Sequence, residues 1–333
     1  MGESQIVQNV QTEPDARVGL TTRVIPTMTL SSASNPLTAP LPSLYGSQRS
    51  IDAIPALARF AVPGHAVITG GAGTLALASA RALLEHGCFG VALLDLSPTL
   101  TSSADLISAL QSDFPERIIK TIHVDVTDED QVNDAMATAN IMLGGTIDIL
   151  CCFAGVVGCV PSIEVSGKEW KRVLDINLNG SFLCAKAAAQ FMISSAAEVS
   201  ELTQTGSSPP AGIPGKSMLF ISSISSATVN FPQPQASYNT SKAGVRHLTR
   251  CLAAEWAVHG IRVNCISPGY MDTILNAGDS LQAVRDVWAS RCPMGRMGDV
   301  EELTGAVVML CSPRAGRYMT GSEVVVDGGA LCF

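Results

Sequence analysis

The sequence predicts an α/β fold in which a doubly wound, parallel sheet of seven strands carries helices on both faces. From Ala66 onward, short apolar runs alternate with stretches of helical periodicity, as is typical of strands joined by helical crossovers. The first run ends in a glycine-rich turn that leads directly into a helix. The 333 residues are 47% hydrophobic and 15% charged, which suits one large domain with a buried core.

The expected elements follow one another in a regular order. Each strand is an apolar run bounded by glycine, proline or a polar cluster. We expect strands at 66–69 and 91–95, within 118–125, and at 147–155, 217–223, 261–269 and 322–329. We expect the main helices at 75–87, at roughly 167–197 and at 238–259.

Composition divides the chain into two parts. Residues 1–60 are rich in Ser, Thr and Pro and show no sustained periodicity, so we expect an extended or partly disordered N-terminal arm. Residues 61–333 form the single predicted domain. Within it, a Gly/Pro/Ser-rich stretch at about 197–216 predicts a surface insertion before the fifth strand.

Charge and cysteine usage exclude several classes of protein. The net charge is −8 and there is no dense Lys/Arg run, so we expect neither nucleic acid nor a membrane surface as a partner. The N-terminal sequence lacks the features of a secretory signal, and no apolar stretch is long enough to span a membrane, which predicts a cytoplasmic protein. The ten cysteines include no C-x-x-C pair, so we expect reduced thiols and no metal site.

The turn after the first strand has the composition of a phosphate-binding turn. Thr69-Gly70-Gly71-Ala72-Gly73 leads into a helix whose N-terminus can receive a dinucleotide pyrophosphate. Asp95 ends the second strand, 25 residues after Gly70, where a carboxylate can bind the adenosine ribose and repel a 2′-phosphate. No Lys or Arg accompanies it, which favours NAD over NADP. An ordinary glycine-rich turn of an α/β fold is the alternative.

Tyr238 and Lys242 form the second candidate site. They lie four residues apart in a predicted helix and therefore on one face of it. An ammonium favours the phenolate, and lowering the pKa of a phenol by ~3 units requires roughly 4 kcal/mol of differential interaction. Ser223, fifteen residues before Tyr238, adds a hydroxyl for a substrate oxygen. The set predicts an acid–base device.

Eight motifs in order resemble the classical short-chain dehydrogenase/reductase family over about residues 60–333. The resemblance implies a Rossmann-type fold and hydride transfer between a nicotinamide cofactor and a secondary alcohol or ketone. A PQPQ segment at 232–235 is similar to largely fungal members that act on polyols, sugar alcohols or secondary metabolites. The motifs are TGGAGTLA at 69–76, Asp95, Asp125-Val126, NLNG at 177–180, ISSISS at 221–226, YNTSK at 238–242, SPG at 267–269 and VDGG at 326–329.

The resemblance also implies a role for each matching residue. Tyr238 would be the general acid/base, and Lys242 would bind the nicotinamide ribose and lower the pKa of Tyr238. Asn177 would continue a proton relay through water. Ser223 would hold the substrate oxygen, although Ser225 has the spacing of other members. The matching cofactor positions are Gly70, Gly73, Thr74, Leu75, Asp95, Asp125, Val126, Ala154, Gly155, Tyr238, Lys242, Pro268, Gly269 and Thr273.

Two of these assignments have alternatives. Asp125, expected near the adenine, could instead cap the next helix through the turn at Thr127-Asp128. Thr74 and Ala76 stand where the family pattern has its last two glycines. The altered turn motivates a second hypothesis, in which the chain is a redeployed member with a non-redox activity such as cyclisation, isomerisation or dehydration. The five histidines have no catalytic companions, and we expect them at the surface or at helix ends.

The segment after the sixth strand predicts the substrate side. It contains Tyr270, Met271, Ile274, Leu275 and Trp288 with few charges, which indicates a mostly apolar, fairly bulky substrate of specialised metabolism. The same residues could instead pack against the sheet. The apolar faces of the two long helices exceed what the sheet can cover, and the family resemblance implies a homodimer or homotetramer.

Overall fold

The structure is a computed structural model that describes residues 26–32, 35–40, 56–204, 215–273, 276 and 281–333. It confirms the predicted sheet: seven strands form one parallel sheet in the order β3-β2-β1-β4-β5-β6-β7. The strands are β1 His65–Thr69, β2 Gly90–Asp95, β3 Ile118–His123, β4 Ile149–Cys152, β5 Lys216–Ile221, β6 Ile261–Pro268 and β7 Glu323–Val326.

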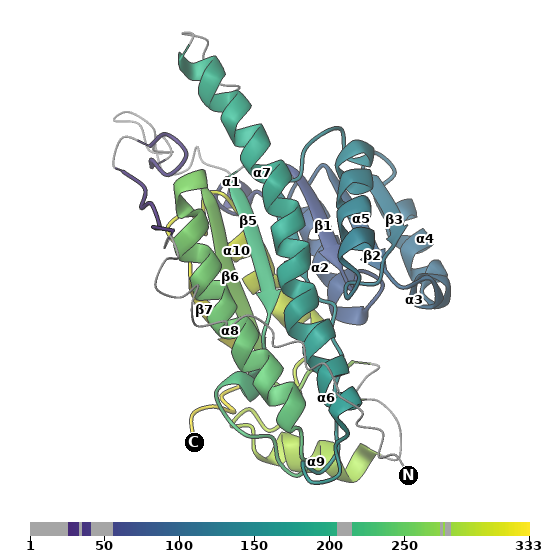
Figure 1. The fold of residues 1–333 in the computed structure, drawn as a ribbon. Coiled ribbons are helices and arrows are strands. Elements are labelled where there is room, and N and C mark those ends of the chain that lie inside the picture. The colour runs from purple at the N-terminus through teal and green to yellow at the C-terminus, as the bar shows by residue number, and fades with distance from the viewer. Residues whose placement is uncertain (1–25, 33–34, 41–55, 205–214, 274–275, 277–280) are drawn as a thin grey trace, which may run out of the picture.

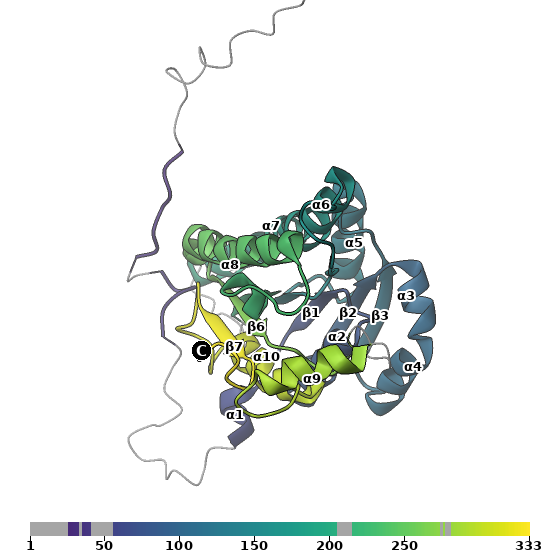
Figure 2. The same ribbon diagram turned by 90° about the horizontal axis from the view of Figure 1, so that it is seen from below.

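Helices cover both faces of this sheet (Figure 1). Figure 2 shows α5, α7 and α8 on one face and α2, α9 and α10 on the other. The helices are α1 Ala56–Phe60, α2 Thr74–Glu85, α3 Ser97–Ser102, α4 Ala104–Asp113, α5 Glu129–Met142, α6 Gly167–Leu174, α7 Gly180–Gln204, α8 Ala236–Trp256, α9 Gln282–Ser290 and α10 Thr304–Cys311.

Two hydrophobic clusters hold the layers together. One joins alternate strand residues such as Val67 and Leu150 to α5, α7 and α8, and the other joins Ile68 and Cys151 to α2 and α10. Because the strands are buried from both sides, they read in the sequence as continuous apolar runs rather than as alternating patterns. All eight residues of β6 are buried, for example.

The helix predicted at 167–197 differs from the observed one in two ways. It is interrupted by a π-helical segment, Asp175–Asn179, between α6 and α7. It also continues past residue 197 to Gln204, so the predicted insertion at 197–216 begins as helix; residues 205–214 lie outside the described part of the chain. The residues from 199 to 204 include the good helix formers Glu201, Leu202 and Gln204, which continue the helix.

The described part of the N-terminal arm contacts the domain. The side-chain amide of Asn35 donates to the carbonyl of Val258 (2.8 Å), and the guanidinium of Arg317 donates to the carbonyl of Ala39 (2.9 Å). Gly260 adopts a positive φ of 72° beside Leu37, and a Cβ there would lie 2.8 Å from the Leu37 Cβ. The arm is also not wholly extended, because Ala56–Phe60 form α1.

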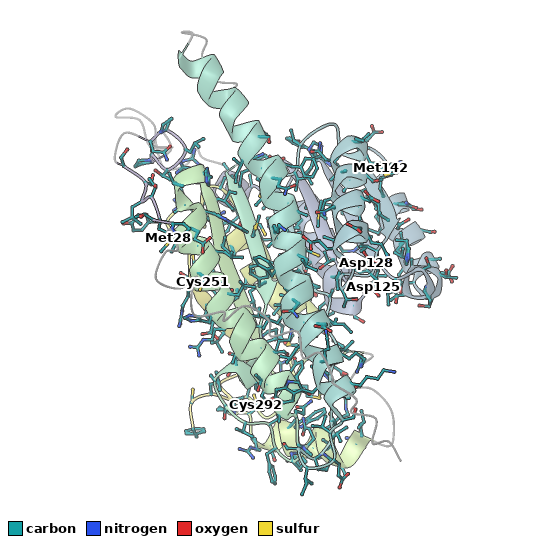
Figure 3. The ribbon with its side chains drawn as sticks, in the orientation of Figure 1. Met28, Asp125, Asp128, Met142, Cys251 and Cys292 are labelled. Carbon is teal, nitrogen blue, oxygen red and sulfur yellow. The ribbon has the colours of Figure 1, made fainter. Side chains whose placement is uncertain are left out.

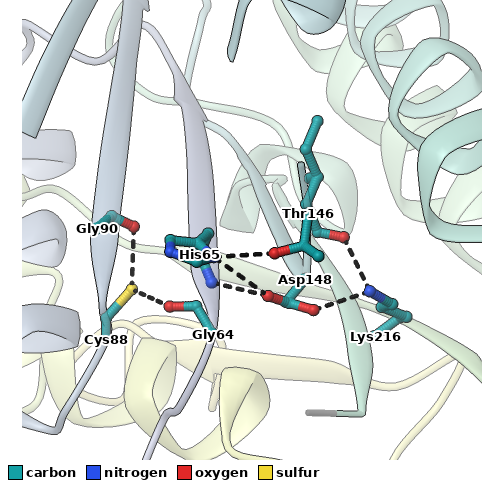
Figure 4. A network of polar contacts seen from close by, with 8 residues as sticks. Gly64, His65, Cys88, Gly90, Thr146, Asp148 and Lys216 are labelled. Atoms are coloured by element: carbon teal, nitrogen blue, oxygen red, sulfur yellow. Dashed lines mark hydrogen bonds and ion pairs between the residues drawn. The ribbon is translucent and has the colours of Figure 1, made fainter. Parts of the chain in front are cut away.

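A buried polar network occupies the amino edge of the sheet (Figure 4). Lys216 Nζ lies 2.8 Å from Asp148 Oδ1, and the other carboxylate oxygen accepts the backbone N–H of His65 (2.9 Å). His65 Nδ1 also lies 2.9 Å from Thr146 Oγ1. His65 was expected at the surface, but it is half-buried at the start of β1, and burial lowers its pKa.

Candidate active site

A large cavity of about 980 Å³ opens at the carboxyl edge of the sheet, the opposite edge from the buried network. Its walls come from the turn before α2 and from the segments that follow β2, β3 and β4. In parallel α/β sheets ligands bind at this edge. The predicted cofactor residues that line the cavity are Gly70, Gly73, Thr74, Leu75, Asp95, Asp125, Val126, Ala154, Gly155 and Thr273.

The glycine turn is shaped for close approach of two backbones. Gly70 has φ +64°, and a Cβ on it would lie only 2.6 Å from the backbone nitrogen of Ala154. A side chain at this position would therefore push the loop after β4 away from the turn. The first intrahelical bond of α2 runs from Leu77 N–H to the carbonyl of Gly73 (2.9 Å). The N–H groups of Thr74, Leu75 and Ala76 precede that bond, as an anion-binding helix N-terminus requires.

Asp95 is fixed beside this turn. One carboxylate oxygen accepts the backbone N–H of Ala72 (3.1 Å), and the other accepts that of Leu96 (2.8 Å). These bonds hold the carboxylate at the rim of the cavity while leaving it partly exposed. The cavity size, the glycine cradle and Asp95 together fit an adenine dinucleotide.

Asp125 takes part in a turn rather than in a helix cap. Its Oδ1 accepts the backbone N–H of Thr127 (2.9 Å) and the Thr127 hydroxyl (2.8 Å). The cap of α5 is Asp128, which accepts the N–H of Gln131 (3.1 Å). Figure 3 labels both aspartates at the start of α5, the end opposite Met142. Asp125 thus both lines the cavity and shapes the turn. The residue that caps the following helix is Asp128, not Asp125.

Ser223 and Tyr238 meet at the end of β5 and the start of α8. The Ser223 side chain lies close enough to the Tyr238 phenol to lower the pKa of Tyr238 by hydrogen bonding, and the Ser223 hydroxyl also accepts the backbone N–H of Ser225 (3.1 Å). The hydroxyls of Ser223 and Ser225 lie 3.0 Å apart. Of the candidate serines, Ser223 is the one that acts on the pKa of Tyr238, while Ser222 donates to the carbonyl of Lys242 (3.1 Å).

The electrostatics of Tyr238 differ from the sequence expectation. Burial raises the pKa of Tyr238 above its ordinary value, and the hydrogen bond from Ser223 opposes this only in part. Lys242 does not lie directly against the phenol: its Nζ is 5.6 Å from the centroid of the tyrosine ring and donates to the carbonyl of Ile221 (2.8 Å). Burial also lowers the pKa of Lys242 to about 8. In this structure Lys242 is not among the groups that shift the pKa of Tyr238, so the lowering of that pKa by Lys242 stays a prediction.

Asn177 braces the loop after β4. It is fully buried in the π-helical segment, where its amide oxygen accepts Val156 N–H (2.8 Å) and its NH₂ donates to the Val156 carbonyl (2.9 Å) and to Ser241 Oγ (2.9 Å). A Cβ on Gly155 would lie 3.3 Å from Asn177 Oδ1 and 3.5 Å from Lys242 Nζ. Asn177, Gly155 and Lys242 are thus neighbours, and the amide fixes the backbone beside the lysine.

Pro268 ends β6 at the same edge of the sheet, and Gly269 follows it. Gly269 N–H donates to the carbonyl of Val326 (2.9 Å), and a Cβ on Gly269 would lie 2.8 Å from the Cα of Asp327. Neither residue lines the large cavity, whereas Thr273 does. Ile274 and Leu275, which we expected on the substrate side, lie outside the described residues.

Sequence reasoning missed a group of polar side chains next to Tyr238. Asn230, Gln233 and Gln235 precede α8, and Gln235 donates to the Cys159 sulfur (3.2 Å). Tyr270 and Trp288 stack with their ring centroids 4.2 Å apart. The signal for two of them was the PQPQ segment itself, which we used only for its similarity to the largely fungal members of the family.

Two absences can be stated for the described ranges. They contain no group of three or more His, Cys, Asp or Glu side chains placed to hold a metal ion. Nor does any helix within them combine the length and apolarity needed to cross a membrane.

Comparisons with known proteins agree with this geometry. A family model described as enoyl-(acyl carrier protein) reductase matches residues 70–330. The chain is 35% identical over 280 residues to a galactitol 2-dehydrogenase of Rhizobium johnstonii, covering 83% of this chain and 98% of that one. It is 34% identical over 278 residues to a D-arabinitol 2-dehydrogenase of Scheffersomyces stipitis, covering 80% and 94%.

A solved structure gives the same result in three dimensions. A short-chain type dehydrogenase/reductase from Mycobacterium marinum superposes with a TM-score of 0.72 at 35% identity, covering 83% of this chain and 99% of that one. The family model spans most of the chain, and the relatives are matched over nearly their whole length. The chain therefore belongs to the short-chain dehydrogenase/reductase family.

Proposed function

We propose that the protein is an NAD-dependent oxidoreductase that interconverts a secondary alcohol and a ketone. The observation that carries this proposal is that Ser223, Tyr238 and Lys242 lie close together at the carboxyl edge of the sheet, beside a cavity that fits a dinucleotide. The family membership supports it, because the relatives named above are alcohol dehydrogenases of polyols.

Four residues of the chain have separate roles in proton transfer and cofactor binding. A nicotinamide cofactor would supply or accept the hydride at the reacting carbon. In reduction, the Ser223 hydroxyl donates to the carbonyl oxygen while the Tyr238 hydroxyl gives it a proton; in oxidation, the alcohol proton returns to Tyr238. Lys242 binds the ribose hydroxyls of the cofactor in this scheme. Asn177 holds the loop that carries Gly155 and, as the family resemblance implies, continues the proton relay through water.

The choice of NAD rests on Asp95. Its carboxylate is fixed at the rim of the cavity, where it would accept ribose hydroxyls and repel a 2′-phosphate. The relatives do not decide between NAD and NADP. One is named an NADH-dependent L-xylulose reductase, from Ambrosiozyma monospora, whereas a gluconate 5-dehydrogenase from Burkholderia cenocepacia was solved with NADP and tartrate.

The substrate we propose from the sequence is fairly bulky and mostly apolar, from a specialised pathway. The stacked rings of Tyr270 and Trp288 support a bulky substrate. A polyhydroxylated substrate is the second candidate, because amide side chains surround those rings and because relatives are named for polyols. We place the protein in the cytoplasm as part of the same proposal.

A direct assay tests the function. Purified protein is incubated with NADH or NAD and a panel of ketones and secondary alcohols, apolar and polyhydroxylated, and nicotinamide absorbance is followed. Tyr238→Phe is expected to lower kcat by about a thousandfold or more while the Kd of NADH by calorimetry stays within about twofold. Absence of NADH and NADPH binding at millimolar concentration would refute the proposal. Product formed by cofactor-free protein would favour the non-redox alternative.

A further inference from the structure

One side of α6 contributes a row of basic side chains to the wall of the large cavity. Lys168, Lys171, Arg172 and Asp175 all line the cavity, and their spacing places them on one side of the helix. We call the three cations the basic face of α6. Figure 2 shows α6 on the same face of the sheet as α7, whereas α2 lies on the other face. The cavity is therefore bounded by helices from both faces of the sheet.

Two of the three cations already have carboxylate partners. Lys171 Nζ lies 2.5 Å from Asp175 Oδ2, one turn further along the chain. The Arg172 guanidinium donates to both carboxylate oxygens of Glu169 (2.7 and 2.8 Å). Lys168 has neither an ion-pair partner nor a hydrogen-bond partner among the residues that the structure describes. Its ammonium is thus the charge of the basic face that a ligand can neutralise.

The position of α6 beside the cavity is well fixed. The Ser166 hydroxyl caps the helix by accepting the backbone N–H of Glu169 (3.1 Å), and the side chain of Val173 is fully buried. The helix continues into the π-helical segment, where Asn177 is bonded to the loop after β4. Side chains on a packed helix are placed more precisely than side chains on a loop. The basic face therefore keeps its place in the cavity wall.

Positive and negative side chains occupy different walls of this cavity. Asp95 ends β2 and Asp125 follows β3, whereas Lys168 belongs to α6. The ribose hydroxyls of an adenine dinucleotide suit the carboxylates, and its pyrophosphate suits an ammonium. The protein as a whole has a net charge of −8 and repels such a ligand, so a local cation at the cavity favours its binding.

We propose that Lys168 binds the pyrophosphate of the nicotinamide cofactor from α6, while the backbone N–H groups at the start of α2 bind it from the glycine turn. The turn has Thr74 and Ala76 where the family pattern has glycine, and a cation outside the turn compensates for the closer backbone approach that those glycines allow. The inference rests on the proposed function in one respect only, because it requires a nicotinamide dinucleotide in this cavity.

Calorimetric titration with NADH tests the role of Lys168. Lys168→Gln should raise the Kd of NADH about two- to fivefold at about 20 mM salt and by less at about 0.5 M, because salt screens the charge of an exposed ammonium. Lys168→Arg should retain the wild-type Kd. Lys186→Gln is the control: it removes the same charge from α7, where Lys186 pairs with Glu129 (2.7 Å) outside the cavity, and should leave the Kd unchanged.

Two further probes locate the contact on the cofactor. ADP-ribose contains the pyrophosphate, so Lys168→Gln should weaken its binding as it weakens that of NADH. Adenosine contains no phosphate, and it should compete with NADH equally well in wild type and variant.

Four outcomes separate the inference from the proposed function. A Kd of NADH that Lys168→Gln leaves unchanged overturns the inference, and so does an equal loss for adenosine. A larger loss for NADPH than for NADH would assign Lys168 to a 2′-phosphate and overturn the inference as well. In these three cases the proposed function stands. A wild type that binds NADH with the expected dependence on Lys168 but reduces no ketone overturns the proposed function alone.

Discussion

At the scale of single residues, two buried lysines illustrate opposite solutions to the same physical problem. Lys216 lies at the amino edge, where Asp148 compensates its charge at 2.8 Å. Lys242 lies at the carboxyl edge, where its Nζ contacts a backbone carbonyl and burial lowers its pKa to about 8. A buried ammonium with no carboxylate beside it destabilises the fold, and such groups are common in active sites.

Replacing each lysine by methionine should therefore change stability in opposite directions. The folded pKa of Lys242, about 8, lies below its ordinary value of 10.5, so the unfolded chain binds more protons between these values and the free energy of unfolding rises with pH in that window. At neutral pH, Lys242→Met should raise the free energy of unfolding by about 2 kcal/mol, the pKa effect less one lost hydrogen bond.

Lys216→Met is the comparison variant for this prediction. It leaves Asp148 buried without its partner and should lower the free energy of unfolding by about 3–5 kcal/mol. Urea denaturation at several pH values measures both effects. Two variants that shift stability in the same direction would contradict the assignment of Lys242 as an uncompensated charge.

The raised pKa of Tyr238 predicts the pH dependence of the two reaction directions. The phenol stays protonated at neutral pH, which is the form needed for ketone reduction. We expect kcat/KM for reduction to be level from about pH 6 to about pH 7, below the pKa of about 8 of Lys242, and kcat/KM for alcohol oxidation to rise about tenfold per pH unit over that range. An oxidation profile that is already level near neutrality would instead mean that bound cofactor lowers the Tyr238 pKa.

The residue types at the site followed from sequence spacing, but their electrostatics did not. Tyr238 and Lys242 stand four apart on a helix, and that spacing is visible in any sequence. The sign of the Tyr238 pKa shift depends on burial and on where the Lys242 ammonium points, which only the folded chain specifies. The amide of Gln233 was overlooked because hydrogen bonds between distant segments leave no local pattern.

At the scale of elements, the start of α2 is where this chain departs from the family's glycine pattern. Thr74 is the first residue of the helix, is exposed and lines the cavity. Its β-branched side chain stands where the family pattern has glycine, while its N–H remains at the helix N-terminus. Because Gly70 and Gly71 already satisfy the close backbone contacts of the turn, Thr74 leaves the fold of the turn intact.

We expect the Thr74 hydroxyl to add a donor for a cofactor phosphate. Thr74→Val keeps the shape and removes the hydroxyl, and it should weaken NADH binding by about three- to tenfold, the effect of one hydrogen bond to a charged group. Thr74→Ser should restore the affinity. Calorimetric titration measures both variants. Tighter binding by Thr74→Gly than by wild type would show that the threonine obstructs the cofactor instead.

Strands were easier to predict than helix ends. The parallel strands are buried on both faces, so their apolar runs stand out in the sequence. The end of α7 was missed because Glu201 and Gln204 are polar and yet favour helix, so composition alone resembled a loop. The role of Asp125 could not be predicted from sequence either, because an aspartate can cap a helix or shape the turn before it.

At the scale of the whole molecule, the outer surfaces of α7 and α8 remain uncovered. Figure 1 shows α7 running beyond the sheet, and Phe182 on this helix is 40% exposed. The C-terminal Phe333 is almost fully exposed as well. We propose that the protein forms a homodimer or homotetramer through these helices, as the family resemblance implies, and the exposed Phe182 on α7 supports this.

Sedimentation tests the proposed assembly. Wild-type protein at micromolar concentration should sediment as a dimer or tetramer, and Phe182→Asp should shift it toward the monomer because it buries a charge in the interface. Phe89→Asp, at an exposed phenylalanine away from α7, is the control and should sediment like wild type. A wild type that is monomeric would contradict the proposal.

The two edges of the sheet differ in one further respect that bears on protein engineering. The network of His65, Asp148 and Lys216 lies at the opposite edge from the cavity, and no member of it lines that cavity. Substitutions selected there for heat tolerance should accumulate without altering turnover, because they share no contact with the reacting groups. Variants in a library restricted to the amino edge would thus change stability alone. Variants in a library restricted to the loops around Tyr270 would change substrate preference and leave this network intact.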